Sequence, residues 1–504
     1  MSWFEDMLAQ VSPEMALKRS AARVRYEHVK KLASRSYDGA ARTRRTANWR
    51  APSTSGTAEN TVAIQTLRNR SRDLFRNDAW ANRGISIVTE CASGIVPEPD
   101  TGKDALDRAI REAFEAHMAD MDADGQGDYY CIQDLACQTI ALSGDVLLRR
   151  RPRRFSDGLH VPLQVQVMEP DHLDMSRRKN GANDVVAGIE LDALNNRLAY
   201  WLYPTHPGEV QLMRGMDLNS RRVSASEIAH AYQKTRPGEM IGVPWLAPVM
   251  IDLRDLHDYE DAEQVRHRTQ ACLAAFVTRN DMGAAQALLG EEGEDDAGVL
   301  ETLEPGMIEY LEQGEDVKFL QPTALANYDS YTRQRLHKIA TGLQMPYMLL
   351  TGDVSRANWS SYKAGIVPFK QRIRRFQKRV LIPMALRPMW KWFIDAAFVA
   401  GRIPEINYGV TYTLPGFEPI DRLKEAMADK MEARIGKTSM PEIIRASGRN
   451  PDAVLRGFSD WFAKTDDREL VFDSDARAVS GAGQVQPDAI SDDDAEPQDT
   501  ETEE

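Results

Sequence analysis

Nucleotide-driven chemistry needs a glycine-rich loop whose backbone N–H groups surround the phosphates and whose lysine reaches the terminal phosphate. Gly-Lys pairs occur at Gly102–Lys103 and Gly436–Lys437, and neither has the upstream glycine of such a loop. The patterns GxGxxG, GxSxG and HExxH are absent, and the nine histidines have no paired ligand spacing. We therefore predict no catalytic residues, no cofactor and no metal site.

One acidic segment comes close to a calcium-binding loop. Asp120, Asp122, Asp124 and Gly125 have the spacing with which such a loop begins. The twelfth position is Cys131, where the loop needs a bidentate Glu to complete the oxygen ligands. Asp and Gly also favour ordinary turns. We interpret the segment as a turn and expect no response to calcium.

An acidic pair, Glu190 and Asp192, lies in a segment with strand character. Alternation places both side chains on one face of a strand, which could hold the metal ion of a nuclease. Solvated strand residues fall in the same way, and we find no histidine or basic partner beside the pair. We therefore disfavour a nuclease.

The formal charge of −13 over 504 residues is concentrated at the C-terminal end. Residues 465–504 contain 14 acidic and two basic residues, a balance of −12, so residues 1–464 are nearly neutral. Residues 281–316 contain 12 acids and no Lys or Arg, whereas residues 354–394 contain ten Lys and Arg and no acid. The acidic total argues against a tight nucleic-acid binder. A nearly neutral body still suits a protein that works around DNA, although each block could simply be a solvated face.

The composition predicts a folded protein of several units. Apolar residues make up 42% of the chain, and the length corresponds to about three structural units. The longest uncharged stretch, Ile339–Gly352, is shorter than the roughly 20 apolar residues of a membrane-spanning helix. The first 30 residues lack the apolar segment of a secretory signal, and four scattered cysteines favour a reducing compartment.

Turn residues and hydrophobic periodicity divide the chain into segments. We expect a basic N-terminal arm over residues 1–59, an α+β body over residues 60–245 and an acidic, disordered tail over residues 465–504. The body should contain helices at residues 62–89, 104–121 and 132–142. Its strands are expected at residues 145–150, 163–168, 185–191, 197–203 and 227–232.

Long helices follow the body. From Val249 to Thr278, apolar or small residues recur in steps of three and four, which predicts a rod of roughly 45 Å. A second helix is expected at Leu325–Leu343, after the acidic insert. A loop over residues 345–358 should precede a helix at Trp359–Val380 that Pro368, Pro383 and Pro388 kink or interrupt. Further helices are expected at residues 420–435, 440–446 and 452–464.

Seven runs of residues occur in an order typical of one phage protein family. They are Tyr37–Arg50, Leu67–Ile85, Ser143–Arg150, Val167–Asp174, Gly188–Glu209, Arg236–Glu263 and Ile339–Gly365. Together they resemble the lambda-type portal family of tailed double-stranded DNA bacteriophages, from about residue 35 to about residue 460. The chain departs from the family at Cys91–Gly94, where a Val-Gly-x-Gly turn is usual, and at Asp421–Arg422, where Asp-Pro is usual. Both departures concern local turn geometry.

The resemblance implies a mainly helical α+β portal fold. The body would be the wing, residues 246–280 and 325–344 the two stem helices, and residues 281–324 the clip between them. Residues 345–358 would be a channel-facing loop, and residues 359–464 a kinked wing helix and a helical crown.

Three sets of residues become candidate sites through this resemblance. The channel loop comprises Thr351, Gly352, Asp353, Val354, Ser355, Arg356, Ala357 and Asn358. The basic wing helix carries Lys363, Lys370, Arg372, Arg374, Arg375, Lys378 and Arg379. The acidic clip contains Glu291, Glu292, Glu294, Asp295 and Asp296. We expect the basic residues to pair with acids of a neighbouring subunit in preference to DNA.

The resemblance also implies a structural protein and not an enzyme. Portal subunits form a ring, usually of twelve copies, through which double-stranded DNA is packaged and ejected at one capsid vertex. The implied partners are the terminase, head-completion or adaptor proteins and the major capsid protein, with no membrane; the implied location is the virion, and the host cytoplasm during assembly. Two alternatives remain: another head-assembly or scaffolding protein, which the predicted strands disfavour, and a DNA-processing enzyme, which the missing phosphate loop disfavours.

Overall fold

The computed structural model describes residues 53–209, 219–271, 328–355, 359–417 and 421–470, with shorter pieces that include residues 18–27, 275–279 and 315–319. The chain divides into two compact units, Met1–Ser55 and Gly56–Glu504. In the first unit, residues 18–27 are helical. The acidic clip residues 291–296 and the acidic tail beyond residue 477 lie outside the described residues.

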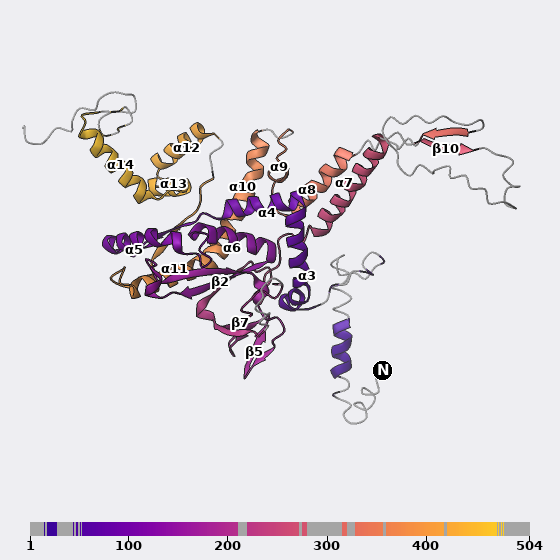
Figure 1. Cartoon of the computed structure of the whole chain (residues 1–504), viewed down its shortest axis with the longest axis horizontal. Helices are drawn as coiled ribbons and strands as arrows, with labels where there is room; N and C mark the ends of the chain where they lie inside the picture. Colours follow the sequence, from indigo (N-terminus) through magenta and orange to yellow (C-terminus); the bar gives the residue numbers. More distant parts are fainter. Residues whose placement is uncertain are drawn as a thin grey trace, which may run out of the picture. The chain divides into compact units, whose positions relative to one another are not determined.

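The second unit begins with four helices (Figure 1). They are α3 (Gly56–Asn77), α4 (Ala79–Ala92), α5 (Asp104–His117) and α6 (Tyr129–Ser143). The prediction of a single helix over residues 62–89 is wrong, because the helix is interrupted between α3 and α4. Asp78 has extended backbone angles there and caps α4 by accepting a hydrogen bond from the Ala81 N–H at 2.7 Å.

Two antiparallel sheets follow α6. β2 (Asp145–Pro152) is the central strand of the first sheet, which has the order β3-β2-β9, and the second sheet has the order β4-β5-β6-β7-β8. The strand expected over residues 185–191 is instead a hairpin, in which Ala187 and Gly188 turn the chain with φ angles of 51° and 77°. The other strands are β3 (Leu163–Met168), β4 (Lys179–Asn180), β5 (Asn183–Val186), β6 (Ile189–Leu191), β7 (Arg197–Leu202), β8 (Arg221–Ser224) and β9 (Ile228–Tyr232).

Short elements complete the body. β1 (Val96–Pro99) pairs antiparallel with β12 (Val410–Thr413). This pairing joins the N-terminal part of the body to the segment that follows residue 399. The short 3₁₀ helices are η2 (Met118–Asp120), η3 (Phe155–Asp157), η4 (Pro170–His172) and η5 (Ala225–Glu227).

The long helix expected from Val249 to Thr278 is shorter than predicted. α7 (Met250–Ala271) ends before β10 (Ala275–Arg279), which pairs antiparallel with β11 (Glu315–Phe319). The sequence AFVTR favours a strand because it is rich in aromatic and β-branched residues. α8 (Tyr328–Gly342) packs beside α7, and the rings of Tyr259 and Tyr331 lie 4.6 Å apart between them.

A continuous helical run follows α9 (Tyr347–Thr351). It consists of α10 (Trp359–Phe376), the π-helix η6 (Gln377–Leu386) and α11 (Arg387–Val399). The run remains helical past all three prolines, so none of them ends it. Pro368 lies inside α10, the α-helical pattern gives way to the π-helix η6 around Pro383, and Pro388 lies at the start of α11.

Three helices follow β12, close to the expected residues. They are α12 (Arg422–Arg434), α13 (Met440–Ala446) and α14 (Pro451–Asp466). Asp421, Ser439 and Asn450 cap their N-termini through side-chain oxygens that accept backbone N–H groups. No residue of α12 or α13 is buried.

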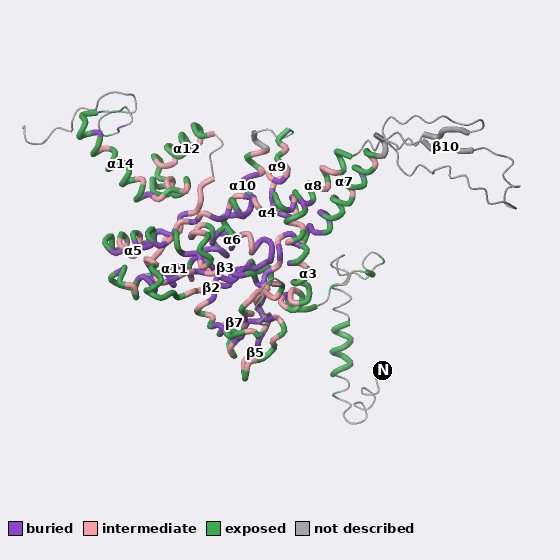
Figure 2. Tube along the Cα trace, viewed as in Figure 1, coloured by how far each residue is buried: buried purple, intermediate pink, exposed green. Residues whose placement is uncertain are grey.

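The main hydrophobic core combines helices from distant parts of the chain with the first sheet. Figure 2 shows buried residues concentrated in α4, α6, β2 and β3. α10, η6 and α11 contribute side chains such as Phe369, Ile373 and Phe393 to the same cluster. A second cluster lies between the two sheets. Within the described ranges, no helix combines the length and the apolar character that crossing a bilayer requires.

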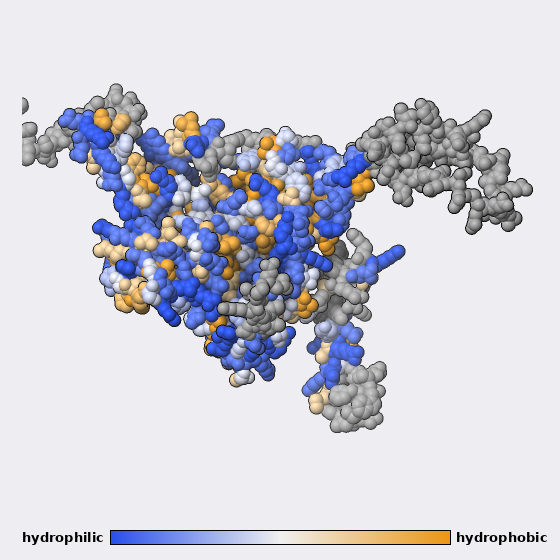
Figure 3. Space-filling model, viewed as in Figure 1, coloured by the Kyte–Doolittle hydropathy of each residue, from blue (hydrophilic) through white to orange (hydrophobic). Residues whose placement is uncertain are grey.

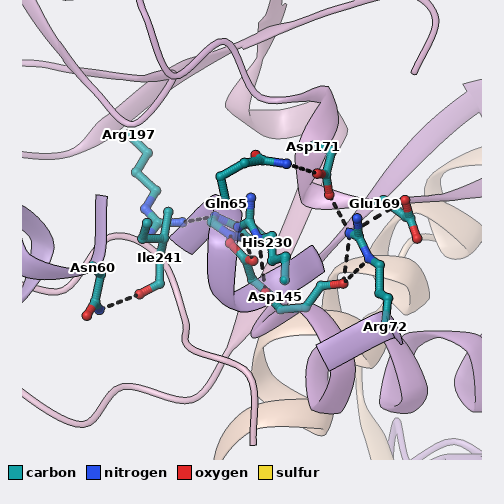
Figure 4. A network of polar contacts seen from close by, with 11 residues as sticks. Asn60, Gln65, Arg72, Asp145, Glu169, Asp171, Arg197, His230 and Ile241 are labelled. Carbon is teal, nitrogen blue, oxygen red and sulfur yellow. Dashed lines mark hydrogen bonds and ion pairs between the residues drawn. The ribbon is translucent and has the colours of Figure 1, made fainter. Parts of the chain in front are cut away.

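A buried ionic network connects α3 to both sheets (Figure 4). The Asp145 carboxylate on β2 accepts hydrogen bonds from Arg68 of α3 at 2.7 Å and from Nε2 of His230 on β9 at 3.0 Å. Arg197 of β7 donates to Nδ1 of His230 at 3.0 Å and to the Tyr232 hydroxyl at 2.5 Å. Burial lowers the pKa of His230, so the ring is neutral and carries its proton on Nε2. The Asp145 carboxylate therefore neutralises the buried Arg68 guanidinium directly, and the neutral His230 ring links it to the half-buried Arg197.

Asp145→Asn is expected to destabilise the fold strongly. The substitution leaves Arg68 buried without a carboxylate, which typically costs about 3–5 kcal/mol. Urea titration at one protein concentration measures the free energy of unfolding.

The control is Glu405→Gln, which removes the exposed Lys103–Glu405 pair with its 2.6 Å contact. It should cost less than about 1 kcal/mol. An Asp145→Asn variant as stable as this control would contradict the role of the network.

Candidate functional site

The segment that resembles a calcium loop uses its carboxylates for local structure. Asp122 accepts a hydrogen bond from the Asp124 N–H at 3.3 Å, and Gly125 turns the chain with a φ of 67°. Asp128 caps α6 by accepting from the N–H groups of Tyr130 and Cys131 at 2.9 and 2.8 Å. In the part of the chain that the structure describes, these carboxylates form no group that could surround an ion.

Glu190 is a buried structural residue. Its carboxylate accepts hydrogen bonds from Arg222 at 2.8 Å, Asn183 at 2.8 Å, Asn180 at 3.1 Å and Trp201 at 3.2 Å. The Arg222 guanidinium is the main reason that the pKa of Glu190 falls to about 2. The interpretation as a solvated strand residue is therefore wrong for Glu190, which is buried and whose basic partner Arg222 is distant in sequence.

Asp192 lies beyond the end of β6, in the following turn. It accepts hydrogen bonds from the backbone N–H groups of Leu194 at 2.8 Å and Asn196 at 2.7 Å. The two carboxylates thus hold separate pieces of structure and share no metal-binding face.

One group that sequence reasoning missed brings Glu169, Asp171 and His206 together, with one ligand atom of each within 4.8 Å of the others. Arg72 pairs with Asp171 and lies 3.5 Å from Glu169 (Figure 4). The Gly208 N–H donates to His206 Nδ1 at 3.0 Å, and His206 Nε2 lies 3.2 Å from Glu169. Because Arg72 balances both acids, we interpret the group as an ion-pair network. The long sequence separation of its members leaves no local signal.

Close backbone contacts join the runs that carry the family resemblance. A β-carbon on Gly242 would lie 2.0 Å from the Gly144 carbonyl oxygen, and Gly144 itself has a φ of 93°. At the end of α8, a β-carbon on Gly342 would lie 2.2 Å from Val249. On α4, a β-carbon on Gly84 would lie 2.8 Å from Leu343. The runs Ser143–Arg150, Arg236–Glu263 and Ile339–Gly365 thus meet where the body joins α7 and α8.

The candidate channel loop begins as a helix. The expectation of a loop throughout residues 345–358 is wrong for Tyr347–Thr351, which form α9. Thr351 donates to the Tyr347 carbonyl at 3.0 Å, and Gly352 ends the helix in the left-handed conformation with a φ of 72°.

Asp353 organises the described part of the loop. It accepts from both the N–H and the hydroxyl of Ser355, at 3.0 and 2.5 Å, and lies 3.7 Å from Arg333 of α8. Val354 is exposed. The remaining loop candidates, Arg356, Ala357 and Asn358, lie outside the described residues.

Three cations of the basic helix make contacts within the chain. Lys363 Nζ lies 3.7 Å from the Glu425 carboxylate of α12, and Lys370 Nζ lies 4.8 Å from the centre of the Phe417 ring. Arg372 donates to the Leu343 carbonyl at the end of α8. Burial lowers the pKa of Arg372 to about 10, so it remains charged at neutral pH. Arg372 therefore holds α10 to the end of α8.

The other four cations form an exposed basic face over the end of α10 and the start of η6. The face comprises Arg374, Arg375, Lys378 and Arg379. Among the described residues, none of the four has a carboxylate within ion-pair distance. Arg374 and Lys378, and likewise Arg375 and Arg379, are four residues apart, and like charges at this spacing destabilise a helix by about 0.2–0.5 kcal/mol per pair. The basic face is therefore a surface that a partner with negative charge would stabilise.

Comparison with known proteins identifies one family. The model of the phage portal proteins of the lambda family matches residues 42–377, which is more than half of the chain. A probable portal protein of Halomonas phage phiHAP-1 is 24% identical over 459 residues, covering 85% of this chain and 86% of that protein.

Two solved structures are also similar. The neck of an empty gene transfer agent particle has a TM-score of 0.45 and 15% identity, covering 81% of this chain and 98% of that chain. An HK97 family phage portal protein from Corynebacterium diphtheriae has a TM-score of 0.31 and 11% identity, covering 64% and 86%. Because both TM-scores are below 0.5, the family match over residues 42–377 carries the assignment.

Glu190→Gln is expected to make stability less dependent on acid pH. A carboxyl with a depressed pKa contributes stability above its unfolded value of about 4.3. The contribution disappears as the pH falls through about 2. The free energy of unfolding should therefore be lower for the variant at pH 7, and the difference should shrink toward pH 2. Asp184→Asn, an exposed acid on neighbouring β5, is the control; equal pH dependence of Glu190→Gln and the unmodified protein would contradict the assignment.

Proposed function

The chain belongs to the lambda family of phage portal proteins, and on this premise we propose how its surfaces build a DNA conduit. Proteins of this family are structural components of the virion and not enzymes, as the sequence predicted. The family match over residues 42–377 is the observation that carries the proposal.

In this proposal, identical subunits related by rotation close a ring, with twelve as the expected number. The stem helices α7 and α8 connect the wing to the clip over residues 281–324, and α12–α14 form the crown. The ring presents docking surfaces to the terminase, the head-completion proteins and the major capsid protein. It assembles in the host cytoplasm before it becomes the portal vertex of the virion.

The charges of the stem support a channel that passes DNA without holding it. Each phosphate that a protein neutralises adds about 0.9 to the salt dependence of binding, so a channel lined with arginines would grip the duplex. In the stem, Asp252 of α7 pairs with Arg335 at 3.0 Å and Lys338 at 2.6 Å, so these α8 cations are balanced inside the subunit. We expect a lumen that is mostly neutral or acidic, with the acidic clip at one end.

Two exposed surfaces support contact between neighbouring copies. The basic face lacks a carboxylate partner among the described residues of its own chain, which a neighbour's acids would supply. On α12, the exposed apolar residues recur at every fourth position and form a stripe that copies can bury: Leu423, Met427, Met431 and Ile435. Figure 3 shows apolar side chains at the surface of α12 and α14.

Reversing Arg374 and Arg375 to Glu is expected to prevent ring closure. The reversal places negative charge against the proposed acids of the next subunit, where like charges repel. Negative-stain top views of the unmodified protein should show rings with a central hole, whereas the variant should yield mainly open or dissociated subunits at the same concentration.

Arg70→Glu with Arg108→Glu is the matched control, because it changes the net charge equally at two exposed arginines outside the basic face. Rings of normal appearance in the Arg374/Arg375 variant, with defective packaging, would mean that the basic face contacts DNA.

Replacing Val354–Asn358 with a Gly-Ser segment of equal length is expected to leave rings intact and abolish DNA retention. The replacement keeps α9, its Gly352 cap and Asp353, and a serine retained at position 355 keeps the hydrogen bonds to Asp353, so the change removes the side chains proposed to meet the duplex. Nuclease-protected DNA per particle should fall to a small fraction of normal. The same replacement in the exposed turn Ala193–Asn196 should have no effect, and normal retention by the loop variant would refute the role.

A further inference from the structure

A second basic surface lies on the first sheet, outside the proposed channel and ring surfaces. Arg149, Arg151 and Arg153 alternate along β2 and the residue after it, so their side chains share one face. On the neighbouring strand β3, Gln166 is paired with Arg149 and Gln164 with Arg151. We call these three arginines and two glutamines the β2 basic strip.

The β2 basic strip begins where the contact between the two sheets ends. Leu147, two residues earlier on the same face, is fully buried in the cluster between the sheets. Arg149 and Arg151 are half-buried, and Arg153 is exposed. The uncovered end of this sheet face therefore carries three guanidinium groups, two of them half-buried.

The three arginines of the strip contact neutral groups of the fold, and the one acid among the described residues that acts on them, Glu227, does so without an ion pair. Arg151 Nε donates to the Gln166 carbonyl oxygen at 2.9 Å, and Arg153 Nε donates to that of Gln164 at 2.7 Å. Arg149 Nε is buried without a hydrogen-bond partner. Within the described residues, none of the three arginines forms an ion pair. Burial and mutual repulsion lower the pKa of Arg151, and Glu227 only partly offsets this.

The chain itself contains an acidic segment with a matching period. In residues 491–504 (SDDDAEPQDTETEE), Asp499, Glu501 and Glu503 alternate with Thr500 and Thr502. In an extended chain, residues i and i+2 lie on the same side and are about 6.5–7 Å apart. This spacing holds for an extended peptide and for β2 alike. Three carboxylates thus repeat at the spacing of the three arginines.

We propose that the acidic segment 491–504, from the same subunit or a neighbour, binds along the β2 basic strip in an extended conformation. Its carboxylates then accept charge-assisted hydrogen bonds from Arg149, Arg151 and Arg153. The threonines between them favour the extended form. A bound acidic segment keeps this surface from holding DNA by nonspecific attraction.

An acidic peptide fits this surface better than a duplex does. A thin extended chain can lie along the strand and reach the half-buried Arg149 and Arg151, whereas a rigid duplex contacts groups that project. The segment is also part of the assembly, so its effective concentration near the strip is high, of the order of millimolar for a flexible tether.

The experiment uses the full-length chain with Asp499→Asn, Glu501→Gln and Glu503→Gln, so that its own segment no longer competes. A fluorescent peptide of residues 491–504 is titrated with this protein and followed by anisotropy. We expect saturable binding that weakens as salt is raised. Adding Arg151→Gln and Arg153→Gln should weaken binding about tenfold or more. The unneutralised full-length chain should bind the peptide more weakly than the neutralised one.

Arg374→Gln with Arg375→Gln is the matched control and should leave peptide affinity unchanged. Absence of binding, or affinity that responds to Arg374 and Arg375 but not to Arg151 and Arg153, overturns the proposal. Binding of a short DNA duplex that depends on Arg151 and Arg153, without peptide binding, also overturns it and assigns the strip to DNA. Thermal unfolding of each variant excludes misfolding. Peptide binding is measured whether or not rings form, so its failure is distinguishable from failure of the proposed function.

Discussion

The buried Asp145 carboxylate is the constraint on which the rest of the body depends. It lies on the central strand of the first sheet and neutralises Arg68 of α3, while His230 links it to Arg197 of the second sheet. Removing it would leave the Arg68 guanidinium unpaired in a low-dielectric interior, so α3 and β2 must keep one arrangement, to which His230 connects β9 and β7. The basic face depends on this arrangement too, because η6 packs against β9 and carries part of that face.

Local patterns in the sequence predicted most elements but not the contacts between distant ones. The mainly helical α+β class and the lambda-type portal family are confirmed. The sequence did not predict the break between α3 and α4 at Asp78, because the apolar pattern continues across the N-cap. It did not predict the end of α7 either, because helical periodicity continues into the short strand β10. Pairs such as Arg222 with Glu190 carry no local signal, since each strand looks ordinary by itself.

The sequence predicted the candidate sites only in part, for a related reason. A basic helix is visible in sequence, but which of its cations face inward depends on the neighbouring elements. Lys363, Lys370 and Arg372 meet α12, Phe417 and the end of α8. The other four remain exposed and without an acid in the described chain. The structure thus separates the basic residues that contact their own chain from those that form the basic face. In a portal ring, we propose, acids of the adjacent subunit contact that face.

The most direct test of this account is a cryo-electron microscopy reconstruction of the assembled particle at side-chain detail. The account predicts a closed ring in which α7 and α8 line the central hole. It also predicts that Arg374, Arg375, Lys378 and Arg379 lie against carboxylates of the adjacent subunit. A ring in which these four side chains face the hole or open solvent would contradict the proposed contact, and a particle without a central hole would contradict the conduit itself.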